Sequence, residues 1–467
     1  MKIASTIKIK DLLHYLSLIF FINFLGVLDY FVYLPRSLFY YEYIIVLLAL
    51  CYSRKVRIAY ILFCVLFLLD IFDVISNIYL FDLSELFSSL KFIFLFKFNL
   101  QHYLILFSVC LYFILTYQYF KYSKRKIEPN KRFFIKFIIV FYLIVILLDV
   151  WNGSSKLVET NDLRKITQKN ISSLLLKNYF EQITQLYKNP VKVVKYKSPS
   201  ITFQSFKDDS TGNQLLVLVE SWGLMNDEIA QKAFESEINM HINNKGYFLQ
   251  WGKTHFSGST ASGELKELLS LKGNYKYFLH HRSDTNNISS IFDYKNKQGY
   301  TTHGFHSYSE NMFNRSVWWK NIGIKNEYFK EDYLKQNSNK KIVIDEDGPF
   351  ASITDIDMFN FMQIKTQNKN KKVFSYLLTE NSHLPFKKII HDNYPTNNFN
   401  FNKLALSEEA KNQLKYIKNL ITVIIQNLDT NKWQKVLIMG DHNPPYLNKN
   451  DRNFYSGNKV PYVLIYK

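Results

Sequence analysis

Five apolar segments fill the first third of this chain of 467 residues. A helix needs roughly 20 apolar residues to cross the hydrocarbon core of a bilayer. The segments lie near Leu12–Leu34, Tyr41–Cys51, Ile58–Leu80, His102–Phe120 and Phe133–Trp151, and the second would extend into Phe39 and Tyr40. Aromatic residues make up 17% of the chain and concentrate in this region, as is typical of membrane proteins. We therefore predict a five-helix transmembrane domain over residues 1–151.

Basic loops set the predicted orientation of these spans. Arg54, Lys55 and Arg57 follow the second segment, and a further basic cluster occupies residues 121–132 between the fourth and fifth. Cytoplasmic loops carry the excess of Lys and Arg, so both loops and the N-terminus are predicted to be cytoplasmic. An odd number of spans then puts everything after Trp151 outside. We expect a multi-pass protein of the cytoplasmic (inner) membrane with an extracytoplasmic C-terminal domain.

Four acidic residues lie within or at the ends of the apolar segments: Asp29, Asp70, Asp73 and Asp149. Carboxylates inside a membrane are costly and are often functional. One hypothesis is that Asp29, Asp73 and Asp149 hold the ammonium group of a lipid headgroup. The alternative, which we favour, is that helix neighbours or water satisfy them.

The overall charge and the cysteines narrow the class of partner. A formal net charge of +19 suits an anionic lipid surface or a phosphate-bearing substrate. With a membrane region present, we expect a membrane partner and no nucleic acid. The three cysteines, Cys51, Cys64 and Cys110, all lie in apolar segments, so the fold after residue 152 uses no disulfides.

Residues 152–212 are predicted to form an amphipathic connector on the outer, membrane-facing surface. Apolar residues recur every three to five positions over Asp162–Lys188, which predicts a helix. Lys and Arg dominate its polar face, as expected beside anionic lipid. Pro190 ends this pattern.

Residues 213–467 alternate between strand and helix patterns. Strands are predicted at Leu215–Val219, Tyr300–His306, Val373–Thr379, Lys435–Met439 and Val460–Tyr466, and helices at Thr260–Leu271, Ile288–Gln298, Ile353–Thr366 and from Ser407 to Leu428. This alternation predicts an α/β domain around a central mixed β-sheet. Its length of about 255 residues suffices to bury a core.

Polar residues end three of the predicted strands. Glu220 follows the first, Asn381-Ser382-His383 the third, and Gly440-Asp441-His442 the fourth. The carboxyl ends of parallel strands gather ligands, and Glu, Asp and His bind zinc or manganese. A single Asp or His at a strand end is often a cap, so Asp441 with His442 is the stronger indication of a metal.

Several hydroxyl residues stand together within Phe256–Leu265, where a helix is predicted to begin. Helix N-termini stabilise phosphates, and metal coordination can activate a hydroxyl there as a nucleophile. The alternative is ordinary N-capping. Spacing alone does not decide between a nucleophile and an N-cap, and it does not identify which hydroxyl would act.

Taken together, these features resemble the lipoteichoic acid synthase and phosphoethanolamine transferase branch of the alkaline phosphatase/sulfatase superfamily. The order and spacing of the similar motifs extend over nearly the whole chain. The first two similar motifs are Glu220-Ser221 and Gly258–Leu265, the latter resembling the family's Gly-Lys-Thr-Ser-Asp-x-Glu-Phe. Next, Gly299–Thr302 resembles Gly-Tyr-x-Thr, His306 resembles the His of Phe-His, and Phe313-Asn314-Arg315 resembles Trp-Asn-Arg. Finally, Ser382–Phe386 resembles Ser-His-x-Pro-Tyr/Phe, and Gly440-Asp441-His442 resembles Gly-Asp-His.

The resemblance implies a sulfatase-like domain with one divalent metal, zinc or manganese. Four residues would hold the metal: Glu220, Thr260, Asp441 and His442. Thr260 would also be the catalytic nucleophile. Three more residues would bind the substrate phosphate and its oxygens: Arg315, His383 and His306.

The activity implied by the resemblance is that of a membrane-anchored transferase. It would move phosphoethanolamine or phosphoglycerol from a phospholipid to a cell-surface glycan or glycolipid through a phospho-threonine intermediate. Phe313 replaces the family's Trp, Ser259 replaces a Lys, and Leu218 stands where some synthases have His, so the headgroup stays open. The alternatives are a phosphodiesterase or sulfatase of the same fold, and a non-catalytic membrane protein that binds a polyanion.

Overall fold

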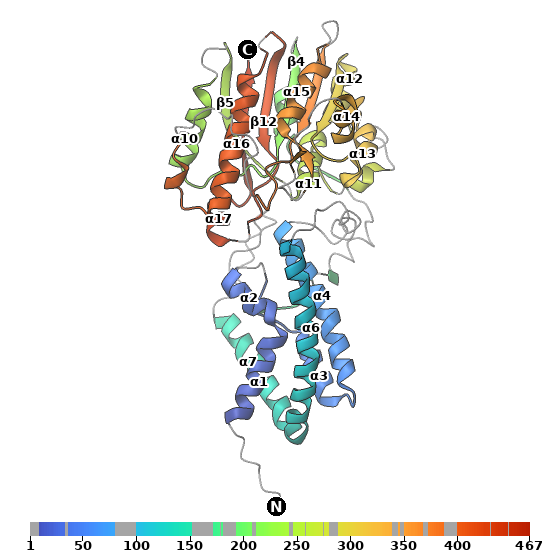
Figure 1. Cartoon of the computed structure of the whole chain (residues 1–467), viewed down its shortest axis with the longest axis vertical. Coiled ribbons are helices and arrows are strands. Elements are labelled where there is room, and N and C mark those ends of the chain that lie inside the picture. Colours follow the sequence, from blue (N-terminus) through green and yellow to red (C-terminus); the bar gives the residue numbers. More distant parts are fainter. Residues whose placement is uncertain are drawn as a thin grey trace, which may run out of the picture. The chain divides into compact units, whose positions relative to one another are not determined.

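The computed structural model describes most of the chain. The described residues are 9–32, 36–79, 100–151, 171–177, 179–180, 193–207, 212–241, 246–256, 258–273, 275–279, 288–338, 344–345, 350–367, 372–386, 399–429, 431–446 and 448–467. The chain divides into two compact units, residues 1–86 with 98–188, and residues 87–97 with 189–467. Figure 1 shows that the first is helical and that the second contains a large sheet.

The helical unit overlaps all five predicted apolar segments. Its elements are α1 (Ile9–Ile22), α2 (Phe24–Val32), α3 (Tyr43–Tyr52), α4 (Val56–Tyr79), α6 (Leu100–Ile127) and α7 (Lys131–Trp151), with two short strands, β1 (Phe39–Tyr40) and β2 (Ser172–Ser173). Among the described residues, two helical stretches are long and apolar enough to cross a membrane, Val56–Ser76 and Tyr103–Trp151. The second contains most of α6 and all of α7. A helical region with apolar helices is therefore confirmed, and the count of five spans stays a prediction.

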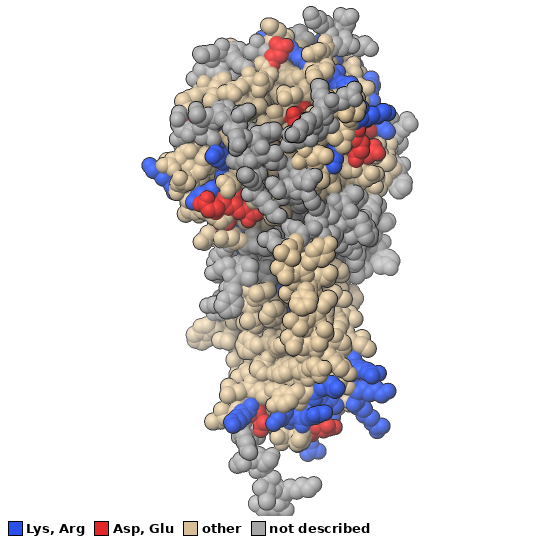
Figure 2. Space-filling model, viewed as in Figure 1, with Lys and Arg blue, Asp and Glu red and all other residues tan. Residues whose placement is uncertain are grey.

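The surface of the helical unit is apolar along its length and basic at one end. Large apolar side chains are exposed on α6 and α7, among them Ile105, Leu106, Phe107, Ile139, Leu143 and Leu147. Lys and Arg gather at the end where α6 stops and α7 starts (Figure 2). An apolar belt bounded by a basic end is the pattern of a membrane-embedded region.

Protein groups satisfy two of the acids in the spans. Asp70 forms a buried ion pair with Arg36 at 2.9 Å. Asp73 accepts a hydrogen bond of 2.7 Å from the hydroxyl of Tyr40. These contacts favour the structural interpretation for both residues, while the side chain of Asp29 lies outside the described residues.

The described part of the connector from residue 171 contacts α7 and β1. β2 pairs in parallel with β1, and Asp149 accepts hydrogen bonds of 2.5 and 3.1 Å from the backbone N–H groups of Ile171 and Ser172. Glu42 accepts two more, of 3.0 and 2.8 Å, from residues 175–176. The prediction of one continuous helix is therefore wrong at β2, because strand pairing and a carboxylate satisfy its backbone groups. Residues 162–170 and 181–188 of that predicted helix lie outside the described part.

The α/β unit is built on a seven-stranded sheet with the order β5-β13-β12-β4-β11-β7-β8. Its strands are β4 (Asn213–Val219), β5 (Phe248–His255), β7 (Thr301–His306), β8 (Asn326–Tyr328), β11 (Val373–Leu378), β12 (Trp433–Gly440) and β13 (Lys459–Tyr466). β12, β4, β11, β7 and β8 run parallel, whereas β13 is antiparallel to both β12 and β5. The predicted central mixed sheet is confirmed.

Helices cover both faces of this sheet. One face packs against α10 (Glu228–Asn239), α15 (Asp355–Lys365) and α16 (Glu408–Gln426), and the other against α11 (Thr260–Leu269), α12 (Ile291–Lys297) and α13 (Arg315–Asn321). In β4, Leu215, Val217 and Val219 enter the first core, and Leu216 and Leu218 enter the second. Burial on both faces explains the unbroken apolar run of this strand.

Shorter elements complete the α/β unit. They are β3 (Val194–Lys195), α9 (Ile201–Phe206), β6 (Leu271–Lys272), α14 (Lys330–Gln336), β9 (Ile344–Asp345), β10 (Ser352–Ile353) and α17 (Lys449–Asn453). As predicted, Ser407 caps the long helix α16, because its side chain accepts a hydrogen bond from the N–H of Ala410.

Candidate active site

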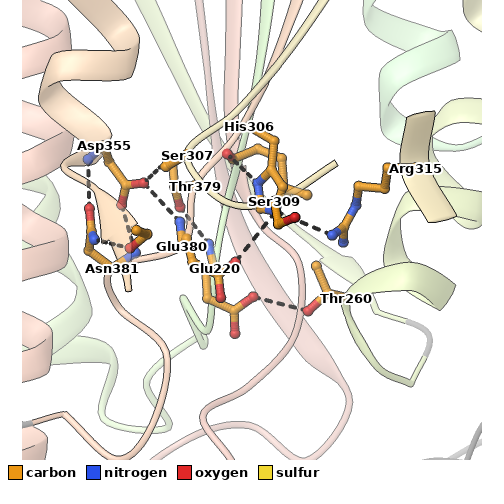
Figure 3. Close-up of polar contacts among 12 residues, drawn as sticks. Glu220, Thr260, His306, Ser307, Ser309, Arg315, Asp355, Thr379, Glu380 and Asn381 are labelled. Atoms are coloured by element: carbon orange, nitrogen blue, oxygen red, sulfur yellow. Dashed lines mark hydrogen bonds and ion pairs between the residues drawn. The ribbon is translucent and has the colours of Figure 1, made fainter. Parts of the chain in front are cut away.

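Polar side chains converge at the carboxyl ends of four neighbouring strands. His306 ends β7, and Glu220, Glu380 and the pair Asp441-His442 follow β4, β11 and β12. The ends of parallel strands meet at one edge of a sheet. Figure 3 shows Glu220, Glu380 and His306 near one another at this edge, with Thr260 and Arg315 approaching from one side.

Glu220, Asp441 and His442 form a buried cluster whose potential ligand atoms all lie within 4.8 Å of one another. His442 Nε2 lies 3.4 Å from Glu220 Oε1 and 3.4 Å from Asp441 Oδ2. His442 Nδ1 lies 2.9 Å from the carbonyl oxygen of Asn443, so it is suited to donate and to leave Nε2 as a ligand. Asp441 Oδ2 is buried and accepts no hydrogen bond from the described residues. This donor set fits a divalent cation.

The two carboxylates of this cluster differ in pKa. Burial raises the pKa of Asp441 well above its usual range, and the neighbouring charge of Glu220 raises it further. Burial alone would raise the pKa of Glu220. The charges of His442 and His383 act in the opposite direction, and the pKa of Glu220 is lowered. Two buried acids this close repel each other, and a cation between them would offset that repulsion.

A strained turn aims Glu220 at its partners. Ser221 has a φ of 55°, in the left-handed region, which costs a residue with a side chain about 1–3 kcal/mol. Its N–H donates to Asp441 Oδ1 at 2.7 Å, and its hydroxyl donates to Glu220 Oε1 at 2.7 Å. The first bond holds the end of β4 to the end of β12, and the second orients the carboxylate of Glu220.

Gly440 permits this close approach, because a Cβ atom there would lie 1.9 Å from the carbonyl oxygen of Trp222. We expect Gly440→Ala to lower the free energy of unfolding by about 3 kcal/mol, the upper part of the usual overpacking range, and to lower bound metal. Gly246→Ala is the control, since a Cβ there meets no atom within 4 Å and costs only the strain of a φ of +67°. Thermal unfolding with metal analysis tests this, and equal stability of both variants would contradict it.

Thr260 is the hydroxyl that the structure brings to the cluster. It is the first residue of α11. Its Oγ1 donates to Glu220 Oε2 at 3.0 Å and lies 3.3 Å from His442 Nε2. Ser259 occupies the N-cap position but makes no side-chain capping bond, and residue 257 lies outside the described residues. Among the described hydroxyls that the sequence left open, Thr260 contacts both Glu220 and His442.

Arg315 is buried beside the cluster and is held by His306. Arg315 Nη1 lies 3.2 Å from His306 Nε2, and His306 Nδ1 lies 3.2 Å from the carbonyl oxygen of Leu378. His306 therefore suits the tautomer that donates from Nδ1 and accepts at Nε2. Burial and the charge of Arg315 lower the pKa of His306 well below the usual range, which favours this neutral form of His306. The structure places His306 as a support for Arg315, with its Nε2 already engaged.

Glu264 supports Arg315 from the other side. Its Oε2 accepts hydrogen bonds from Arg315 Nε at 3.0 Å and Nη2 at 2.9 Å. Its Oε1 accepts from Trp319 Nε1 and from the Tyr376 hydroxyl, both at 3.1 Å. A carboxylate with four donors fixes the guanidinium, so the remaining N–H groups of Arg315 are preorganised to bind an anion. The sequence placed Glu264 within a family motif without giving it this role.

Among the described residues, His383 forms no side-chain hydrogen bond with Arg315 or His306. Its Nδ1 is 2.6 Å from the carbonyl oxygen of Leu384, and its ring packs edge-on against Phe350 at 4.9 Å between centroids. His383 follows β11, the strand next to β4, so it belongs to the same edge of the sheet as Glu220.

Asp355 is a site residue that the sequence did not single out. It is fully buried and accepts hydrogen bonds from the N–H groups of Glu380 and Asn381, at 2.9 and 3.0 Å, and from the hydroxyls of Ser307 and Tyr416. Burial raises its pKa to about 6. Asp355 fixes the turn after β11 and with it the position of Glu380 (Figure 3). The sequence did not single out Glu380 either, although it stands two positions before the motif that begins at Ser382.

Several solved structures resemble this chain. The lipoteichoic acid synthase LtaP from Listeria monocytogenes is 20% identical with a TM-score of 0.39, and the match covers 60% of this chain and 70% of that one. The phosphoglycerol transferase GacH from Streptococcus pyogenes is 17% identical with a TM-score of 0.37, covering 56% and 70%. The phosphoethanolamine transferase EptA from Neisseria meningitidis is 14% identical with a TM-score of 0.44, covering 81% and 72%.

The family is shown by a different comparison. No curated protein matches the sequence at a significant level. The model of the sulfatase family matches residues 213–467, which is the whole predicted outer domain and more than half of the chain. The chain therefore belongs to the sulfatase family.

Proposed function

We propose that the protein is a membrane-anchored, metal-dependent transferase that moves phosphoethanolamine or phosphoglycerol from a phospholipid to a cell-surface glycan or glycolipid. One observation carries this proposal. The hydroxyl of Thr260 lies at the N-terminus of a helix and within 3.3 Å of two members of a buried Glu-Asp-His cluster. A hydroxyl so placed is suited to attack phosphorus.

The reaction proceeds in two displacements. Thr260 Oγ1 forms a bond to the phosphorus of the donor phosphodiester while the bond from phosphorus to the diacylglycerol oxygen breaks. The proton of the Thr260 hydroxyl passes to the departing diacylglycerol, and the headgroup phosphate remains as a threonine ester. A hydroxyl of the acceptor glycan then displaces Thr260, which regains a proton.

Charged side chains of this chain support both displacements. A zinc or manganese ion held by Glu220, Asp441, His442 and Thr260 would supply the charge that activates a hydroxyl and stabilises a phosphate. Arg315, fixed by Glu264, offers free N–H groups to the phosphate oxygens. His383 is available to the entering or departing oxygen.

We propose that the helical unit anchors the enzyme in the cytoplasmic membrane with five spans. The basic end of this unit in Figure 2 would face the cytoplasm with the N-terminus, and the α/β unit would be extracytoplasmic. This orientation gives the site access to phospholipid donors and surface acceptors. ATP is not needed, because the donor ester bond is exchanged for another.

Mass spectrometry of surface glycans tests the proposed transfer. Cells with the wild-type chain are expected to carry one headgroup mass more on the acceptor than cells with Thr260→Ala. Free headgroup released to water, with unmodified glycans, would instead show a hydrolase of the same fold. Equal glycans and equal lipid turnover in both strains would overturn both activities.

Removing a metal ligand is expected to empty the site. Asp441→Asn should weaken binding of zinc or manganese by more than the 10–100-fold that changes to supporting residues cost, and chelation of the wild-type should abolish transfer. Asp429→Asn is the control, since this exposed residue precedes the opposite end of β12. Metal analysis of purified protein provides the readout, and full metal occupancy in Asp441→Asn would contradict the assignment.

A further inference from the structure

Glu380 carries a buried carboxylate that the chemistry above does not use. Its side chain is 9% exposed and its Oε2 lies 3.7 Å from His306 Nε2. Its backbone N–H donates to Asp355 at 2.9 Å, but no donor among the described residues forms a hydrogen bond with its carboxylate. Its oxygens are also outside the cluster of potential metal ligands found in the described part.

Arg315 is a cation whose charge reaches Glu380, but its guanidinium is already paired with Glu264. Glu220 and Asp441 share the metal site, Glu264 pairs with Arg315 at 2.9 Å, and Asp355 has four hydrogen-bond donors. Burial raises the pKa of Glu380 well above its usual range, and the charge of Glu220 raises it further. A buried carboxylate with so little compensation is costly, and a cation brought by the substrate would relieve that cost.

The ring of Tyr308 lies 6.5 Å, between centroids, from that of His306, whose Nε2 is close to this carboxylate. Tyr308 is buried, and its pKa is raised by burial and by the charge of Glu380. Its ring packs against Phe350 at 5.0 Å between centroids, and Phe350 in turn contacts His383. Aromatic faces attract ammonium groups. A carboxylate and neighbouring aromatic rings suit an ammonium better than the neutral hydroxyls of glycerol.

We propose that Glu380 determines the donor by pairing with the ammonium group of a phosphoethanolamine headgroup. The inference rests on the proposed transferase function and chooses between its two headgroups. The phosphate of this headgroup would meet Thr260 and Arg315, while its short ethanolamine arm reaches toward Glu380. Phosphoglycerol would leave the carboxylate without a counterion.

The test is a competition between two donors on the full-length protein. Wild-type protein loaded with metal is mixed with vesicles of equal phosphatidylethanolamine and phosphatidylglycerol, and the headgroup esterified to Thr260 is identified by mass spectrometry. We expect phosphoethanolamine to exceed phosphoglycerol at least about tenfold, and Glu380→Gln to reduce this ratio about tenfold or more. Glu310→Gln, which removes an exposed acid, should keep the ratio.

A second measurement does not depend on the folding of any variant. N-acetylated phosphatidylethanolamine has lost its positive charge, and wild-type protein should use it at least about tenfold less than the parent lipid. Preference for phosphatidylglycerol, equal use of the acetylated lipid, or an unchanged ratio in a folded, metal-loaded Glu380→Gln variant would overturn the assignment while leaving the transferase in place. Absence of any headgroup on wild-type Thr260 from either donor, with no diacylglycerol released, would overturn the transferase itself and this assignment with it.

Discussion

Replacing Thr260 with alanine is expected to lower headgroup transfer by three orders of magnitude or more, the scale seen when an enzyme loses its nucleophile. At the start of α11, the hydroxyl of Thr260 contacts both Glu220 and His442. The variant should keep its fold, because Thr260 is partly buried and deletion of its hydroxyl and methyl group leaves the helix cap position unchanged. Diacylglycerol release and mass spectrometry of the intact protein measure the loss and the missing phospho-threonine.

Two matched variants separate nucleophilic attack from a general role of hydroxyl groups at this helix. Thr260→Ser keeps a hydroxyl at the same position and should retain measurable transfer. Ser262→Ala removes a nearby hydroxyl from the same helix turn and should stay within about tenfold of wild-type. Transfer by Thr260→Ala at the level of Ser262→Ala, or a covalent headgroup on another residue, would contradict the assignment of Thr260.

The strand ends were predictable because their signal is local. An apolar run such as Leu215–Val219 fixes where a buried strand stops, and parallel pairing brings the residues after it to one edge. Glu220, Asp441 and His442 therefore converge as expected, although more than 200 positions separate the first from the other two. Spacing alone could not single out Thr260, because its contact with Glu220 depends on the position of α11 against β4.

The supporting residues could not be predicted in the same way. Glu264 and Arg315 are 51 positions apart, and their contact depends on how α11 packs against α13. Asp355 depends likewise on the turn after β11. The strand β5 was missed because it lies at the sheet edge, where Gln250, Lys253 and Thr254 interrupt an apolar pattern. The helix predicted through Ser172 was wrong there because this residue pairs with β1 as a strand, although the apolar residues around it recur with a helical spacing.

Replacing Glu264 with glutamine is expected to destabilise the α/β unit by about 3–5 kcal/mol, the cost of leaving a buried charge without its partner. Arg315 is 2% exposed, so water cannot take the place of the carboxylate. The loss is large against a total stability of about 5–15 kcal/mol. Tyr376→Phe is the matched control, because it removes one neutral donor to the same carboxylate and should cost only about 1 kcal/mol. Denaturant unfolding of the purified protein compares the two.

A double variant separates the effect of Glu264→Gln on stability from its effect on headgroup transfer. Glu264→Gln combined with Arg315→Met removes both charges, so it should recover much of the lost stability. Transfer should nevertheless stay low, because the guanidinium that offsets phosphate charge is gone. Equal stability of Glu264→Gln and Tyr376→Phe would show that Arg315 does not depend on this carboxylate. Restored transfer in the double variant would show that Arg315 serves the fold alone, whereas stability without activity assigns the pair to the site.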